Sequence, residues 1–271
     1  MPLTLCADDL GQSEAISEAI VELAERGRIN AATLMVDGVE ASSSAVAFNS
    51  LGRGSLGLHV TLSGETVPAP SELAPDCRLP NVDALAARAF AGRLPLAAIA
   101  AEIERQYDRF EAMTGRRPDF VDGHQHVHVL PGIRRLFLAA ARRREPDAWI
   151  RTCEESAATI WRRAAFRWTA LRSALLSRGL SAQAERIGLR TNLGFAGLYD
   201  FRARPDYGAL FGRWLVGSGV RPLIICHPSR PDPADPIGAA RVEEYRFLAS
   251  SQPAALLAQA GLSLEGPAHD R

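Results

Sequence analysis

Short apolar runs alternate with amphipathic helical segments along most of this chain. Residues 3–7 are apolar enough for a buried strand, and in residues 13–27 Ile16, Ile20 and Leu23 recur at helical spacing. The same alternation continues to the C-terminal region. Further strands are predicted at residues 29–38, 55–62, 119–129 (a strand and its exit), 148–152, 189–195 and 221–229. Further helices are predicted at residues 40–51, 96–115, 131–144, 241–250 and 253–260, with a helical region at 155–187.

This order of strands and helices predicts a parallel sheet with helices outside it. About seven repeats favour a (β/α) barrel over an open sheet, and 271 residues suit one barrel domain spanning residues 1–271. Two segments depart from the repeat. Residues 155–187 are predicted to be a helical insertion. Residues 63–83 contain four prolines and no periodic spacing of apolar residues, so they are predicted to form a long functional loop.

Composition narrows the class of protein. A hydrophobic content of 47% supports a large core, and 31 basic against 31 acidic residues argue against a general nucleic-acid-binding protein. The N-terminal sequence does not resemble a signal peptide, and no apolar run approaches the ~20 residues of a membrane span. The four cysteines form no CxxC pair. We therefore expect a cytoplasmic protein with reduced thiols.

Polar side chains follow the predicted strands at the point where each strand ends. In α/β barrels the carboxyl ends of the strands carry the active site, so side chains from distant segments should converge at one mouth. This convergence predicts an enzyme. The residues concerned are Asp8, Asp9, His59, His124, His126, His128, Arg151 and His227.

Three of the six histidines, His124, His126 and His128, stand at alternate positions. In an extended segment all three rings would share a face, whereas in a helix only His124 and His128 would. Imidazole and carboxylate groups are ligands of zinc and related ions, and a catalytic site needs only three protein ligands. At least one histidine of the run should therefore serve another purpose. A single histidine in an apolar strand, such as His59, is more often a hydrogen-bonded core residue than a metal ligand.

The two adjacent carboxylates pose a separate question. Successive side chains of a strand point to opposite faces, so Asp8 and Asp9 are expected to have separate roles. One of them could instead cap the helix that starts near Ser13. His227 follows a buried strand, and its ordinary pKa near neutrality makes it a candidate general acid or base.

Four motifs in order, "ADDLG" at residue 7, "GLHVTL" at 57, "DGHQHVH" at 122 and "CHPS" at 226, resemble the YdjC family of carbohydrate deacetylases. Leu10 and Ser229 depart from the Phe and Gly more usual in that family. The resemblance implies a distorted (β/α) barrel, a homodimer, and removal of the N-acetyl group from an amino sugar. The sugar could belong to an oligosaccharide, a nucleotide sugar, a glycan intermediate or a glycolipid.

The resemblance also implies one divalent ion, bound by Asp9, His59 and His124. Family members are reported with magnesium, but two imidazoles favour zinc or another transition ion. Asp8 would accept the proton of the attacking water, and His227 would protonate the leaving amine. Arg151 would orient Asp8 or hold a sugar hydroxyl. The other two histidines of the run would contact substrate or support the site.

Two other functions fit the same residues. One is a different barrel metal-hydrolase, acting on phosphoesters or cyclic amides. Such enzymes often place an HxH pair after the first strand, where this chain has two carboxylates. The other is a non-catalytic barrel that binds a metal or a sugar, although every residue needed for chemistry is present.

Residues 158–179 contain five arginines and no acidic residue. Trp161, Trp168, Leu171 and Leu175 recur at spacings that place them on one helical stripe. In one interpretation the stripe packs on the sheet and the arginines are solvated. In the other, the segment is a basic amphipathic helix that makes peripheral contact with a membrane.

Overall fold

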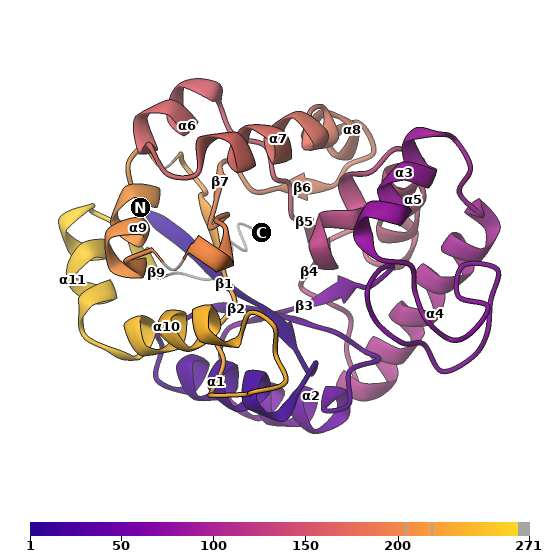
Figure 1. The fold of residues 1–271 in the computed structure, drawn as a ribbon, viewed down its shortest axis with the longest axis horizontal. Helices are drawn as coiled ribbons and strands as arrows, with labels where there is room; N and C mark the ends of the chain where they lie inside the picture. The colour runs from indigo at the N-terminus through magenta and orange to yellow at the C-terminus, as the bar shows by residue number, and fades with distance from the viewer. Residues whose placement is uncertain (204, 218, 265–271) are drawn as a thin grey trace.

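A parallel sheet of buried strands forms the centre of the molecule (Figure 1). This computed structural model describes residues 1–203, 205–217 and 219–264. Most strands are short, and their residues are almost all buried. The strands are β1 Pro2–Leu10, β2 Ala31–Leu34, β3 Ser55–Val60, β4 Phe120–Gly123, β5 Trp149–Ile150, β6 Arg190–Thr191, β7 Phe195–Ala196, β8 Leu223–Cys226 and β9 Ser263–Leu264.

The strand order is β6-β5-β4-β3-β2-β1-β8-β7, with β9 beside β1, and each of these neighbouring pairs is parallel. The strands therefore follow one another around the sheet in chain order, as in a (β/α) barrel. Within the described residues β6 and β7 do not pair, which leaves the curled sheet open between them. The predicted distorted barrel is confirmed.

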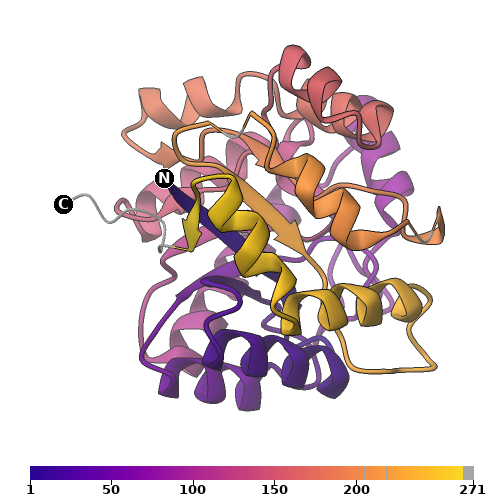
Figure 2. The same cartoon turned by 90° about the vertical axis from the view of Figure 1, so that its left-hand side faces the viewer.

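Helices cover the outside of the curled sheet (Figure 1). Helix α1 illustrates why the sequence folds this way: Ser13 caps it by accepting from the Ile16 N–H, and Ile16, Ile20 and Leu23 are buried. The helices are α1 Glu14–Glu25, α2 Ala41–Ser50, α3 Val82–Phe90, α4 Leu96–Thr114, α5 Ile133–Arg144, α6 Ala157–Arg163, α7 Arg167–Ser177, α8 Leu180–Arg186, α9 Tyr207–Trp214, α10 Gly238–Ala249 and α11 Gln252–Gln259. Figure 2 faces α10 and α11, which lead to β9.

The helical region predicted at residues 155–187 forms three separate helices. Ala164 and Phe166 adopt left-handed backbone angles (φ 52° and 42°), which end the helical path between α6 and α7. The side chains of Trp161, Trp168 and Leu175 are 49%, 74% and 59% exposed. The predictions of one continuous stripe and of its packing on the sheet are therefore wrong.

Several short elements were not predicted, among them α3, α9, β7 and β9. The loop that begins at residue 63 folds back on itself through an antiparallel bridge between Thr66 and Arg78. It ends at Asn81, which caps α3 by accepting from the Ala84 N–H at 2.8 Å. Across the described ranges, no helix has both the length and the apolar character needed to cross a membrane.

Candidate active site

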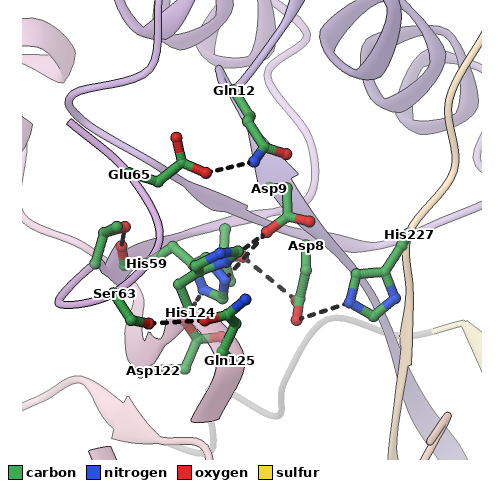
Figure 3. Close-up of polar contacts among 12 residues, drawn as sticks. Asp8, Asp9, Gln12, His59, Ser63, Glu65, Asp122, His124, Gln125 and His227 are labelled. Carbon is green, nitrogen blue, oxygen red and sulfur yellow. Dashed lines mark hydrogen bonds and ion pairs between the residues drawn. The ribbon is translucent and has the colours of Figure 1, made fainter. Parts of the chain in front are cut away.

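A pocket of about 530 Å³ opens at the carboxyl ends of β1, β3, β4 and β8. Figure 3 shows the carboxylate and imidazole side chains pointing toward one another at its floor. The predicted site residues that line the pocket are Asp8, Asp9, His59, His124, His126 and His227. His128 and Arg151 are fully buried and do not belong to its lining.

Both carboxylates of β1 face this pocket, which contradicts the expectation that they point to opposite sides. The pairing of β1 with β2 shifts register between Ala7 and Leu10, and Asp9 itself has φ 71°. This irregularity reverses the usual alternation of side chains. Left-handed backbone at a residue other than glycine costs ~1–3 kcal/mol and is typical of functional sites. The expectation that an aspartate caps α1 is also wrong, because Ser13 is the cap.

Asp9, His59 and His124 bring one donor atom each to a common point. Oδ1 of Asp9 lies 3.0 Å from Nδ1 of His124 and 3.4 Å from Nε2 of His59. The three donor atoms all lie within 4.8 Å of one another, and all three residues are buried. Arg241 donates to the other oxygen of Asp9 at 2.6 Å. Burial raises the pKa of Asp9, but Arg241 and His124 outweigh it and hold that pKa well below its usual range.

Asp122 supports His59 from the neighbouring strand β4. Nδ1 of His59 donates to Oδ1 of Asp122 at 2.5 Å, and both side chains are buried. Burial alone would lower the pKa of His59, but the Asp122 carboxylate outweighs it and raises that pKa to about 10. A hydrogen bond of this kind fixes the ring so that Nε2 faces the ligand cluster, as in carboxylate–histidine–zinc sites. The donor set therefore fits a divalent ion.

Arg151 connects the two acidic groups beneath the pocket. Its Nη1 donates to Oδ1 of Asp8 at 2.6 Å and lies 3.0 Å from Oδ2 of Asp122. Nε2 of His128 in turn donates to the backbone carbonyl of Arg151 at 3.0 Å. Burial disfavours the Asp8 carboxylate, but Arg151 outweighs it and holds the pKa of Asp8 well below its usual range. Asp8 is thus ionised at neutral pH.

A second group of potential ligand atoms, from Cys6, Asp8 and Asp122, lies deeper. The Arg151 guanidinium already pairs with both carboxylates of this group. Burial and the Asp8 charge raise the pKa of the Cys6 thiol well above its ordinary value, so it is not a thiolate. Because the thiolate is the ligand form, this group is a poor metal site.

His227 approaches Asp8 from β8, on the other side of the pocket. Its Nε2 lies 3.8 Å from Oδ2 of Asp8, and its ring meets Phe201 edge-on at 5.2 Å between centroids. Its backbone N–H donates to Oε2 of Glu244 at 2.6 Å, and Glu244 also accepts from the Tyr199 hydroxyl at 2.6 Å. Burial lowers the pKa of His227 to about 4, against the opposing effect of Asp8 and Asp9. Its imidazole is therefore neutral at pH 7.

The histidine run is neither extended nor α-helical. It forms a 3-10 segment, His124–Val129, in which Gln125 and His126 are left-handed (φ 50° and 58°). The three rings consequently diverge. His124 contacts Asp9, His126 lines the pocket, and His128 donates to the backbone carbonyl of Arg151. Burial lowers the pKa of His126 to about 3, so this ring is neutral as well.

Three functional residues were not recognised in the sequence. Asp122 is visible in the quoted motif, directly before Gly123 and the histidines, and could have been found there. Arg241 and Glu244 lie on α10, three positions apart, and both are buried. Their segment looked like an ordinary outer helix, so nothing in its pattern indicated that these charges face inward.

The pocket rim combines polar and aromatic side chains. Gln12 donates to Glu65 at 2.8 Å, which ties the loop after β3 to the loop after β1 (Figure 3). Leu198, Tyr199 and Phe201 also line the pocket. The predicted long loop thus contributes to the site through Glu65 at its base.

The fold and the site together define the class of protein: an open α/β barrel with a carboxylate–imidazole cluster of metal-binding type where its strands end. Within that class, this chain belongs to the YdjC family, whose model, described as YdjC-like protein, matches residues 2–259. The resemblance inferred from the four motifs is confirmed.

Several relatives of similar sequence are named as deacetylases. A chitooligosaccharide deacetylase of Klebsiella pneumoniae is 29% identical over 85% of this chain and 82% of its own length. A carbohydrate deacetylase of Mus musculus is 37% identical over 51% of this chain and 46% of its own length. The match to this and several other relatives thus spans about half of their length.

A solved structure shares the fold. A protein of Enterococcus faecalis V583, described as a cellobiose-phosphate cleavage protein, superposes with a TM-score of 0.76. The alignment covers 98% of this chain and 97% of that one at 19% identity, so this likeness concerns the fold alone.

Proposed function

We propose that this protein is a metal-dependent hydrolase that removes the N-acetyl group from an amino sugar. The observation that carries the proposal is the convergence of Asp8, the Asp9–His59–His124 cluster and His227 in one pocket. Membership of the YdjC family and the deacetylase names of its relatives support the same reaction.

The ion would be held by Asp9, His59 and His124. A divalent cation bound there would polarise the acetyl carbonyl and lower the pKa of a water molecule in the pocket. Two imidazoles and one carboxylate favour zinc or another transition ion, whereas magnesium prefers oxygen ligands. His59 would release its Nε2 proton on binding, while Asp122 retains the proton on Nδ1.

Asp8 is the proton acceptor in this proposal. Its carboxylate is ionised, it points into the pocket, and Arg151 fixes one of its oxygens. The other oxygen, Oδ2, faces His227. As the water oxygen bonds to the acetyl carbon, one of its protons passes to Asp8.

His227 then donates a proton to the sugar nitrogen as the carbon–nitrogen bond breaks. Because its ring is neutral beforehand, it must first gain that proton during turnover. The nearest source is the protonated Asp8, 3.8 Å from Nε2. One proton of the water thus moves through Asp8 and His227 to the amine, and its hydroxyl remains with the acetyl group as acetic acid.

The remaining pocket residues would position the sugar. Tyr199 and Phe201 would offer apolar contacts to the sugar, and the neutral His126 ring would offer a polar one. The buried Nδ1 atoms of His126 and His227 have no hydrogen-bond partner among the described residues.

The test is acetate release from a panel of N-acetylated substrates, measured with zinc, with magnesium and with a chelator. The panel contains an oligosaccharide, a nucleotide sugar, a glycolipid and monosaccharides. Chromogenic phosphodiester and cyclic amide substrates are assayed in parallel. Chelator-sensitive acetate release supports the proposal. Turnover of only the phosphodiester or the cyclic amide would assign another hydrolase activity, and metal binding without any turnover would indicate a binding protein.

A further inference from the structure

Helices α6 and α7 expose aromatic side chains that most proteins bury. Trp161 and Trp168 are 49% and 74% exposed, and their rings meet edge-on with centroids 6.1 Å apart. The Arg167 guanidinium lies over the Trp161 ring at 4.8 Å. Leu175, 59% exposed, follows Trp168 by two helical turns on the same face of α7. Contiguous exposed apolar side chains of this kind mark interaction sites.

The segment that carries these aromatic side chains is strongly basic. Between residues 156 and 178 the chain has five arginines and no acidic residue, whereas the whole chain is neutral. Arg163 is buried and pairs with Glu155 at 3.1 Å. The other four are exposed, and in the described part of the chain none of them lies within 4.0 Å of a carboxylate. We call the side chains of Trp161, Arg162, Arg167, Trp168, Arg172 and Arg178 the Trp–Arg face.

This face lies along one edge of the molecule and is linked to the pocket. Figure 1 places α6 and α7 on the side opposite α1 and α2. Phe166, between the two helices, packs against Tyr199 with centroids 6.1 Å apart, and Tyr199 lines the pocket. The backbone turn that presents Trp168 is therefore fixed to the wall of the active site.

The chemistry of the face decides which partner fits. A second copy related by a two-fold axis would bring the arginines of both copies together, which is unfavourable. A neutral glycan carries no negative charge with which the four unpaired guanidinium groups could pair. An anionic lipid surface is complementary to both the tryptophans and the arginines. Trp side chains favour the membrane interface, and Arg side chains pair with acidic head groups.

We propose that the Trp–Arg face docks this protein onto the surface of an anionic lipid membrane. The contact is peripheral and goes beyond the proposed deacetylase activity. Trp161 and Trp168 enter the head-group region, and the four arginines neutralise acidic lipids around them.

The experiment is co-sedimentation of the full chain with phosphatidylcholine vesicles, with and without phosphatidylserine, at low and high salt. Binding is expected only to the anionic vesicles, and it should weaken at high salt because surface charges are screened. Trp161→Ala/Trp168→Ala and Arg167→Gln/Arg172→Gln should each weaken it about tenfold or more. The matched control is Phe90→Ala/Arg93→Gln, which removes an exposed aromatic residue and an exposed arginine elsewhere.

Circular dichroism and zinc binding of each variant show that the fold and the ligand cluster are intact. Absence of binding to anionic vesicles at low salt would overturn the proposal. An equal loss of vesicle binding in the control variant would also overturn the proposal. Binding of an oligonucleotide without vesicle binding would assign the face to nucleic acid, and dimerisation abolished by the tryptophan variant would assign it to a second copy.

Discussion

Asp122 and His59 are direct cross-strand partners: their Cα atoms are paired in the register of β3 and β4, and their side chains meet at 2.5 Å. The regular geometry of a parallel pair thus places a carboxylate beside the candidate ligand histidine. Both residues lie within strands, so the sheet itself positions this part of the candidate metal site.

We expect Asp122→Asn to weaken zinc binding by ~10–100-fold, because the amide no longer fixes the ring of His59 as a carboxylate does. His59→Ala should lose both the metal and the activity. Isothermal titration with zinc and elemental analysis measure these effects. Asp76→Asn, in an exposed loop, is the control. Full metal content in His59→Ala would show that the ligand assignment is wrong.

The two carboxylates of β1 should give different phenotypes. Asp8→Asn is expected to keep the metal and lose ~10²–10⁴-fold in turnover, because the amide cannot accept a proton. Asp9→Asn should instead weaken metal binding, and Asn tolerates the left-handed backbone at this position. Metal titration and acetate release for both variants provide the comparison. The opposite pattern would mean that the two roles are exchanged.

His227→Ala should affect substrates according to their leaving group. Hydrolysis of an N-acetyl sugar is expected to fall ~10²–10⁴-fold, because an amine leaves poorly without a proton. An activated aryl acetate needs no such proton, so its hydrolysis should fall much less. His126→Ala, at the pocket wall, serves as the comparison and should raise KM instead. Equal losses on both substrates in His227→Ala would rule out its role as the acid.

Glu244 should make the folded state less stable as the pH rises. Burial raises its pKa from an ordinary 4.5 to about 7, so the folded state holds this proton more tightly than the unfolded chain. The resulting stabilisation is fully present below about pH 4.5 and is lost as the pH rises through 7. At ~1.4 kcal/mol per pKa unit it amounts to a few kcal/mol.

Glu244→Gln removes this titration. Urea unfolding at pH 5 and pH 8, with chelator present throughout, should therefore show a smaller decline in this variant than in the parent. The adjacent Glu243→Gln is the matched control, because Glu243 is exposed and pairs with Arg246. An unchanged slope in Glu244→Gln would show that Glu244 does not carry the effect.

The sequence predicted much of the barrel because most of its strands are short apolar runs and most of its helices have one apolar face. Helix α1 and its Ser13 cap follow directly from such a pattern. The pattern failed at Phe166, where a left-handed turn breaks a stripe that had appeared continuous. Backbone reversals at residues other than glycine have no periodic signature, so they could not be predicted.

The candidate site was predictable where ligand-type residues end strands. On that basis a larger set of strand-end side chains was expected to converge. The resemblance to the YdjC family then singled out Asp9, His59 and His124, whose donor atoms lie close together in the structure. The orientation of the neighbouring Asp8 was not predictable, because it depends on the irregularity of β1. Arg241 was missed for a different reason: its burial is a tertiary property of α10 and leaves no mark on the local sequence.

That irregularity of β1 has a mechanical consequence. Asp8 and Asp9 are joined by a single peptide unit, so their Cα atoms keep a fixed separation, and in the proposed mechanism the proton acceptor and the metal ligand move together. His227 directly follows a different strand, β8, and its distance from Asp8 changes with any sliding of β8 along β1. In that mechanism, moderate heating or a loosened core is therefore expected first to impair protonation of the leaving amine, while cation binding and the activation of water persist.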